Sequence, residues 1–279
     1  MNQRKSMVGI ISHYSIAWII AVIWLIPFIG IFITAISPLE EVVHGWWGVK
    51  LSSISFKNFA GAWSHPTAPI GQGIRNSLIV AVPSAFFPIV LASLAAYGIL
   101  RYRFPFRKTI FIITLLLLAI PQHMVAIPLF QILKGLKLID SYFGLVLVHT
   151  AWGIPWIILF MRGYFSTLPQ EVEEAAHIDG AGPWKTFFRI IIPMSWPGLA
   201  SIFCLQFSWV WNDFFLALIF IYNPDKLLAT QRIPLLRGVY HVDWGILTAA
   251  ALLITTVPIL IFILLQKYYV KGFLGFASK

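Results

Sequence analysis

The segment "EVEEAAHIDGAGPWKTFFRIIIP", residues 171–193, lies between two strongly apolar stretches of the chain. Its first half is acidic and small, and its second half is aromatic and aliphatic with a few cations. A charged side chain at the centre of a bilayer costs roughly 2.5–3.5 kcal/mol on insertion scales, so such a segment belongs outside the hydrocarbon. It therefore predicts a surface element between two membrane spans.

The composition of the whole chain agrees with this prediction. Of the 279 residues, 59% are hydrophobic and 11% are charged, as in integral membrane proteins. A helix needs about 20 consecutive apolar residues to cross a bilayer core. Runs without Asp, Glu, Lys or Arg that reach this length, allowing one Asp inside the fifth, are residues 6–39, 76–100, 109–133, 141–161, 190–224 and 244–266. We therefore predict an all-α integral membrane protein with six transmembrane helices.

The basic residues predict the orientation. An even number of spans places both termini on one side, and cytoplasmic loops retain Lys and Arg. With both termini inside, the inside segments hold more than half of the 20 Lys and Arg residues, including all four of "RYRFPFRK" at 101–108. Both termini are therefore predicted to be cytoplasmic. The net charge of +10 is spread over span ends rather than gathered in one patch, so lipid is an expected partner and nucleic acid is not.

Local signals divide residues 169–193 into two helices. Residues 167–170 fit a capping box, and acidic residues follow in the first turn, where the helix dipole favours them. Gly180, with a Gly-Pro pair shortly after it, predicts the end of this first helix. A small apolar face, which another protein could approach closely, is formed by Val172, Ala175 and Ala176.

The second half of the segment predicts an amphipathic helix at the membrane surface. Apolar residues recur at helical spacing at Trp184, Phe187, Phe188, Ile191 and Ile192. Lys185 and Arg189 fall on the opposite face. By periodicity alone, the whole segment also fits an amphipathic cytoplasmic loop of any polytopic membrane protein.

The particular residues narrow this choice. Glu174-Ala175-Ala176 is followed after three residues by Gly180 and after nine more by Ile190, with Pro193 three further on. This spacing resembles the EAA motif of ATP-binding-cassette (ABC) importer permeases, except that Ile192 stands where the motif usually has Leu. Other segments similar to carbohydrate-uptake permeases are "NSLIVA" from Asn76, "AAYGILRYRFPFRK" from Ala95, "WVWNDFF" from Trp209 and "YYVKGF" from Tyr268. Over about residues 75–271 the chain resembles the MalG-like permease subunit of a carbohydrate-type importer.

The resemblance implies the type I ABC importer (MetI-like) permease fold in a prokaryotic inner membrane. It divides the chain into a first transmembrane helix with an extracytoplasmic loop (1–74), an importer transmembrane domain (75–271) with a coupling segment (169–193), and a cytoplasmic tail (272–279). The implied function is ATP-driven uptake of a mono- or oligosaccharide or a sugar-like compound. The implied partners are a second, non-identical permease subunit, two ATPase subunits and an extracytoplasmic solute-binding protein.

The resemblance also assigns residues. Those implied to couple to the ATPase are Glu174, Ala175, Ala176, Asp179 and Gly180. The chain has no G-x-x-x-x-G-K-[ST] loop, so it is not expected to be an enzyme. ATP and Mg²⁺ are expected on the partner ATPase, and neither a cofactor nor a metal site is expected in this chain.

Asp213 is the one acidic residue inside a predicted span. A charge at that depth must face a cavity, a neighbouring helix or a partner. With Asn212 and the aromatic rings of Trp209 and Trp211, it is a candidate for the substrate pathway, because hydroxyl-rich sugars bind such groups. The alternatives are a structural hydrogen-bond acceptor and a contact to the second permease.

Other solutes and other classes of protein remain as alternatives. A glycerol phosphoester, a polyamine or a peptide would suit an importer permease, because only the resemblance favours sugar. A secondary transporter would have discontinuous helices, an internal repeat and several intramembrane ionisable groups, and a membrane enzyme would need a catalytic pair at one depth. The sequence shows one intramembrane acid, no convincing repeat and no such pair.

Overall fold

The computed structural model describes residues 7–43, 45–238 and 242–277. Within these ranges the regular structure is helical, apart from an isolated β-bridge between Arg237 and Val242. The predicted all-α class is therefore confirmed. The chain divides into two compact units, one of residues 1–71 and 232–254 and one of residues 72–231 and 255–279.

The first unit contains a long apolar helix and a folded loop. Its elements are α1 (Met7–Ala35), α2 (Leu39–Val42), α3 (Lys57–Trp63), the start of α14 (Trp244–Ala277), and 3₁₀ turns at Trp46–Gly48, Leu51–Ser53 and Pro234–Leu236. The Glu41 carboxylate accepts hydrogen bonds from the Lys50 N–H at 2.9 Å and the Ser53 hydroxyl at 2.7 Å. The Asn58 amide donates to two carbonyl groups at the end of α1, at 3.1 and 2.9 Å. Polar side chains thus fold the loop that follows the first span.

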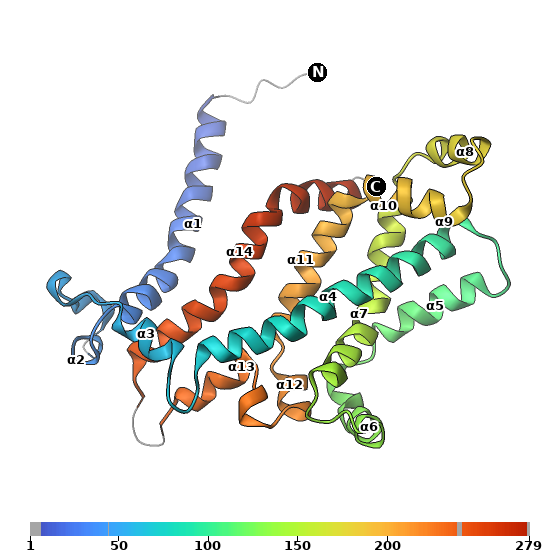
Figure 1. The fold of residues 1–279 in the computed structure, drawn as a ribbon. Coiled ribbons are helices and arrows are strands. Elements are labelled where there is room, and N and C mark those ends of the chain that lie inside the picture. Colours follow the sequence, from blue (N-terminus) through green and yellow to red (C-terminus); the bar gives the residue numbers. More distant parts are fainter. Residues whose placement is uncertain (1–6, 44, 239–241, 278–279) are drawn as a thin grey trace. The chain divides into compact units, whose positions relative to one another are not determined.

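The second unit is a helical bundle. Its helices are α4 (Ile70–Arg101), α5 (Arg107–Leu117), α6 (Gln122–Gly135), α7 (Tyr142–Phe165), α8 (Gln170–Ile178), α9 (Pro183–Thr186), α10 (Ile192–Met194), α11 (Trp196–Asn212), α12 (Phe215–Phe220), α13 (Ala229–Arg232) and the later part of α14, with a π-helical turn at Phe187–Ile191 and a 3₁₀ turn at Pro224–Lys226. Within this unit α8 and α9 lie at one end of the long helices, and α6 and α12 lie at the other (Figure 1).

The described helices account for the predicted spans. Four are long and apolar enough to cross a membrane, namely Tyr14–Ala35, Ile70–Arg101, Tyr142–Phe165 and Trp244–Tyr268. Two bent pairs also qualify: α5 with α6, bent by 101°, and Pro183–Met194 with α11, bent by 74°. Counting each pair as one span gives the six predicted. The first bend follows from Pro121, which precedes α6 in an extended conformation and cannot continue a helix.

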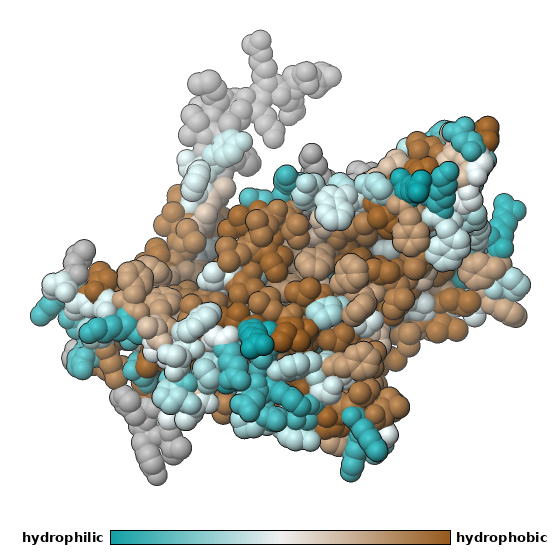
Figure 2. Space-filling model, in the orientation of Figure 1, coloured by the Kyte–Doolittle hydropathy of each residue, from teal (hydrophilic) through white to brown (hydrophobic). Residues whose placement is uncertain are grey.

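The core of the second unit lies where α4, α7, the π-helical turn and α11 meet, and it includes Ala92, Ile157, Phe165, Ile191 and Ile202. Outside this core, many large apolar side chains are exposed. Figure 2 shows them as a broad apolar surface, with hydrophilic residues near α8 and towards α12 and α13. Such a surface suits hydrocarbon rather than water.

Candidate functional site

The predicted coupling segment contains a separate short helix, α8, at one end of the second unit (Figure 1). Pro169 precedes it in an extended conformation, and no side chain caps its first turn. The predicted capping box is therefore wrong. The Thr167 hydroxyl donates instead to the Tyr164 carbonyl at 2.7 Å, because Thr167 still belongs to the turn that closes α7.

The predicted end of α8 is confirmed. Gly180 has φ +78°, a left-handed conformation that glycine adopts without strain. Its N–H donates to the His177 carbonyl at 3.0 Å, and the Ala181 N–H donates to the Ala176 carbonyl at 2.9 Å. This pair of bonds is a Schellman motif, which satisfies carbonyl groups that a helix end would otherwise leave free. The chain therefore leaves α8 in a defined turn.

An ion pair that the sequence did not predict anchors α8 to α4. Oε1 of Glu173 lies 2.6 Å from Nη2 and 2.8 Å from Nε of Arg101. The Tyr97 hydroxyl donates to the other carboxylate oxygen at 3.0 Å. The Arg101 and Glu173 side chains are 12% and 8% exposed. Since buried charges need such partners, Glu173 fixes the orientation of α8 on the bundle.

Only weak signals for this pair exist in the sequence. Arg101 is one of several cations in a basic cluster, and Glu173 is one of several acids at a helix start. The positional signal for burial is the spacing of Glu173 and Ala176. Residues three apart lie on the same face of a helix, so these two side chains can be buried together. The structure buries that face, leaving these residues 6% and 7% exposed.

The opposite face of α8 is open. The exposed members of the predicted coupling set are Glu174, Ala175, Asp179 and Gly180. The predicted apolar face is divided, because Val172 is exposed whereas Ala176 is buried in its own chain. Ile178, which was not singled out from the sequence, is 87% exposed. An exposed apolar strip along α8 is formed by Val172, Ala175 and Ile178, which are spaced three residues apart.

The second predicted helix is present, but its apolar stripe is divided between core and surface. Phe187 and Ile191 are 2% and 1% exposed. Trp184 and Phe188 are 64% and 51% exposed, with their rings stacked at 6.0 Å. The predicted apolar stripe therefore does not face a single surface, because Phe187 and Ile191 pack into the core of the second unit. A π-helical turn changes the helical register there, and the Phe187 ring packs 5.0 Å from that of Tyr97.

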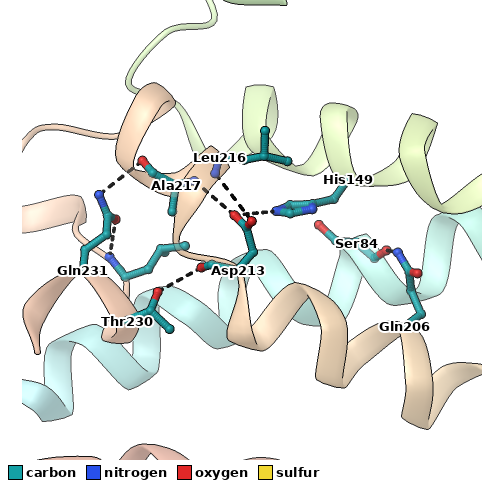
Figure 3. A network of polar contacts seen from close by, with 9 residues as sticks. Ser84, His149, Gln206, Asp213, Leu216, Ala217, Thr230 and Gln231 are labelled. Atoms are coloured by element: carbon teal, nitrogen blue, oxygen red, sulfur yellow. Dashed lines mark hydrogen bonds and ion pairs between the residues drawn. The ribbon is translucent and has the colours of Figure 1, made fainter. Parts of the chain in front are cut away.

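Asp213 occupies a break between α11 and α12 rather than a continuous helix (Figure 3). Its carboxylate accepts hydrogen bonds from the N–H groups of Ala217 at 3.1 Å and Leu216 at 3.5 Å, in the first turn of α12. Nε2 of His149, on α7, lies 3.8 Å from its Oδ2. The Asp213 side chain is 9% exposed. The carboxylate thus caps α12 next to a buried imidazole.

Polar side chains bind backbone carbonyl groups at this break and at the end of α12. The Thr230 hydroxyl donates to the Asp213 carbonyl at 2.9 Å. The Gln231 amide donates to the carbonyl of Ala217 at 3.2 Å (Figure 3) and to that of Ile221 at 2.9 Å. Irregular backbone at membrane depth is tolerated only where such partners exist. Thr230 therefore stabilises the break, and Gln231 stabilises the end of α12.

Gln206, on α11, is a buried polar residue that the sequence did not single out. Its side chain accepts a hydrogen bond from the Trp156 indole at 2.9 Å and donates to the Ser84 carbonyl at 3.2 Å. Gln206 is 2% exposed. One buried amide therefore joins α11 to α7 and α4. A Cβ atom at Gly153 would lie 2.7 Å from its Nε2, so any larger residue there would displace the Gln206 amide.

The four predicted pathway residues differ in accessibility. Trp209 is 47% exposed, and Asn212 is exposed with its amide donating to the Ser208 carbonyl at 2.7 Å. Trp211 is 2% exposed and stacks 5.5 Å from Phe207. Asp213 caps α12. Their assignment to a substrate pathway stays a prediction, and only the first two offer side chains to a solute.

At the end of the bundle away from α8, Asp140 joins two loops. Its Oδ1 accepts hydrogen bonds from the N–H groups of Asn223 at 3.0 Å and Tyr222 at 3.1 Å. The Lys226 ammonium lies 3.3 Å from Oδ2. Burial raises the pKa of Asp140, but these three partners lower it more, so the pKa lies below its usual value of 3.8.

Comparisons with known proteins agree with this architecture. A family described as binding-protein-dependent transport system inner membrane component matches residues 68–274. A probable ABC transporter permease protein of Pyrococcus horikoshii is 52% identical over 94% of this chain and 95% of its own length. The trehalose/maltose transport system permease protein MalG of Thermococcus litoralis is 34% identical over 94% of this chain and 94% of its own.

The fold is also found in a crystal structure of a bacterial ABC transporter involved in the import of the acidic polysaccharide alginate. The TM-score is 0.80 at 22% identity, with 96% of this chain and 99% of that chain covered. The predicted importer permease fold is therefore confirmed. Together with the apolar helices and the family match, these similarities show that the chain is a multi-pass membrane protein belonging to the family of binding-protein-dependent transport system inner membrane components.

Proposed function

We propose that this chain is one permease subunit of an importer that uses ATP to take up a carbohydrate or sugar-like compound. The relative from Thermococcus litoralis is named for trehalose and maltose, and the similar crystal structure comes from an alginate importer. The family itself is named for its dependence on a binding protein. These three similarities support a solute delivered by a soluble partner and favour saccharides over phosphoesters, polyamines and peptides.

The observation that carries the coupling role is the two-sided construction of α8. One face is fixed to α4 through Glu173 and Arg101, and the other presents Glu174, Ala175 and Ile178 to the outside. A helix that is rigidly attached on one side and open on the other can receive force from a partner. The chain has no nucleotide-binding loop of its own, so that partner is the ATPase subunit.

Motion of α8 would pass directly to the spans. Arg101 is the last residue of α4, and Tyr97, one turn earlier, contacts both Glu173 and the Phe187 ring. The π-helical turn that contains Phe187 continues through α10 into α11. A displacement of α8 therefore acts on α4 and α11 together. Such coupled movement suits a transporter whose central pathway opens alternately to the two sides of the membrane by rigid-body motion.

The proposed assembly contains this chain, a second non-identical permease, two ATPase subunits and an extracytoplasmic solute-binding protein. Both termini and α8 lie on the cytoplasmic side in this proposal, because residues 101–108, which join α4 to α5, carry four cations. The solute would pass near Trp209 and Asn212, whose side chains are exposed beside the break between α11 and α12. An aromatic face with a nearby amide suits sugar hydroxyl and C–H groups.

Uptake by the reconstituted complex tests this proposal. Proteoliposomes that hold all subunits would be offered radiolabelled maltose, trehalose, glycerol 3-phosphate, spermidine and a tripeptide, with ATP or ADP on the ATPase side and the binding protein on the other. We expect saccharide uptake with ATP only. Uptake that is independent of ATP would exclude the importer mechanism, and uptake of a non-saccharide alone would replace the sugar assignment.

A further inference from the structure

A partly open cavity of about 450 Å³ lies in the second unit beside the π-helical turn. It is lined by residues of α4, the π-helical turn, α10, α11 and α14, among them Phe86, Val90, Phe188, Trp196, Phe203 and Leu265. Apart from Ser93, every lining residue is aliphatic or aromatic. The cavity is therefore suited to a hydrocarbon ligand and offers little to a sugar.

The elements around the cavity place it at the boundary between hydrocarbon and headgroups. Phe86 and Phe203 lie within α4 and α11, in stretches that contain no charge. Phe188, in the π-helical turn that follows α9, and Trp196, the first residue of α11, are 51% and 53% exposed. Exposed aromatic rings of this kind concentrate at membrane–water interfaces. The cavity thus leads from the interface into the bilayer.

Two cations neighbour residues that line this cavity. Arg189 directly follows Phe188 and is exposed. The Lys267 ammonium lies 4.8 Å from the centre of the Tyr268 ring, which in turn meets the Trp196 ring edge-on at 6.4 Å. The lining elements, which are α4, residues 183–212 and residues 244–279, contain no Asp or Glu. The two cations therefore have no acid on the lining elements to neutralise them.

We propose that this cavity binds one hydrocarbon chain of an anionic phospholipid, with the lipid phosphate held by Arg189 and Lys267. The cavity decides where a chain lies, since a void lined by apolar atoms forfeits dispersion contacts until hydrocarbon fills it. It does not choose between lipids, because all lipid tails are about as apolar as the lining. The cations make that choice, each strengthening the attraction of an anionic headgroup about fivefold.

Such a lipid would contact the element that joins α8 to α11. Phe187 and Phe188 line the cavity, and Phe187 also packs on Tyr97 of the α8 anchor. A bound chain would therefore support the π-helical turn from the membrane side. The inference does not depend on which solute is transported.

The test counts lipids retained by the purified complete complex. After exchange into micelles containing equal amounts of dioleoyl-phosphatidylglycerol and dioleoyl-phosphatidylcholine, native mass spectrometry measures the ratio of the two lipids bound. We expect preferential retention of phosphatidylglycerol. Arg189→Gln combined with Lys267→Gln should lower the preference by about 25-fold. Arg103→Gln combined with Lys108→Gln, which lie outside the lining elements, is the matched control and should not change it.

Two further variants keep the outcome unambiguous. Lys267 lies far along the chain from the coupling segment. Lys267→Gln alone should therefore lower the preference for phosphatidylglycerol about fivefold, even if Arg189→Gln disturbs assembly. Val90→Trp narrows the cavity at a position that is 37% exposed and should reduce retention without changing charge. Equal retention of both lipids would overturn the proposal. So would cross-linking of Val90→Cys to the second permease in a complex that retains no lipid, because the cavity would then be a subunit interface.

Discussion

Arg101 at the end of α4 and Glu173 in the first turn of α8, 72 residues apart in sequence, form a buried ion pair in which both Nη2 and Nε of the guanidinium contact Oε1. A second bond from Arg101 reaches the Phe165 carbonyl at 3.3 Å, at the end of α7. The same guanidinium therefore links two spans to the surface helix. Its position makes the attachment of α8 sensitive to a single side chain.

Arg101→Gln should detach α8 and destabilise the chain. Removing one partner of a buried ion pair typically costs about 3–5 kcal/mol, because the remaining charge is left without compensation. Replacing both partners, as in Arg101→Leu with Glu173→Leu, should cost less than the sum of the single changes, since no charge is then buried. Thermal unfolding of the purified subunit gives the stabilities, and ATPase stimulation by loaded binding protein gives the coupling.

Glu174→Gln is the matched control for these variants. Glu174 follows Glu173 directly but is exposed. Its neutralisation should change the unfolding free energy by no more than about 0.5 kcal/mol. Equal destabilisation by Glu173→Gln and Glu174→Gln would show that the ion pair does not hold α8.

The features of α8 that follow from local chemistry could be predicted from the sequence. The end of the helix at Gly180 could be predicted because it depends only on hydrogen bonds to neighbouring residues and on the freedom of glycine to adopt a positive φ. Thr167 was assigned wrongly because two helices compete for its hydroxyl, and α7 obtains it. The Arg101–Glu173 pair could not be predicted, since no local pattern brings residues from α4 and α8 together.

The transmembrane spans likewise show that features set by local sequence could be predicted, whereas features that depend on tertiary contacts could not. Five uncharged runs, and a sixth interrupted only by Asp213, predicted where the chain can cross hydrocarbon, because the requirement is set by length and composition alone. The break at Asp213 depends on Thr230, which follows after α12 and donates to the Asp213 carbonyl. Such a break needs tertiary partners, so hydropathy could not indicate it.

Glu174→Lys should impair coupling without impairing folding. The residue is exposed on the outer face of α8, where the charge reversal would repel a cationic partner surface and leave the Glu173 anchor intact. We expect normal membrane insertion and subunit yield, with uptake and ATPase stimulation reduced to background. Full uptake by this variant would argue against docking through this face.

Gly180→Ala should weaken the turn that ends α8. A Cβ atom at this position would have no neighbour within 4 Å, so the expected cost of about 1–2 kcal/mol comes from the left-handed backbone alone. Gly182→Ala is the control, because Gly182 has φ −71° and is equally open. Gly180→Asp adds a charge to the exposed face and should abolish transport while the subunit remains inserted. Hydrogen exchange at residues 176–181 would detect loosening of the turn, and unchanged protection in Gly180→Ala would contradict the strain argument.

Asp140→Asn should remove a pH-dependent contribution to stability. Because the pKa of Asp140 is lowered by its partners in the folded chain, the contribution is present above the usual value of 3.8 and is lost as the pH falls below it. Asn tolerates the φ of +56° at this position, so the backbone is retained. The variant should be about 1 kcal/mol less stable at neutral pH, a modest value because Lys226 is 40% exposed.

Thermal unfolding between pH 3 and 7 checks this prediction. The difference between the native chain and Asp140→Asn should be constant above about pH 5 and should shrink below about pH 4. Asp225→Asn is the matched control, since the backbone carbonyl of Asp225, rather than its carboxylate, receives bonds from Asn76 and Gln72. A difference that persists undiminished to pH 3 would assign the effect to geometry rather than to charge.

Replacement of Asp213 separates a structural from a solute-binding role. Asp213→Leu leaves two N–H groups in the first turn of α12 without their acceptor and should destabilise the chain by about 1–2 kcal/mol, as expected for the loss of a helix cap. Asp213→Asn keeps one acceptor oxygen and should cost less. If the carboxylate serves only α12, both variants lower the yield or the unfolding temperature of the complex and leave the apparent KM for uptake unchanged. A large rise in KM for Asp213→Asn at normal yield would instead place this carboxylate in contact with the solute, because a merely structural acceptor has no reason to alter affinity when its geometry is preserved.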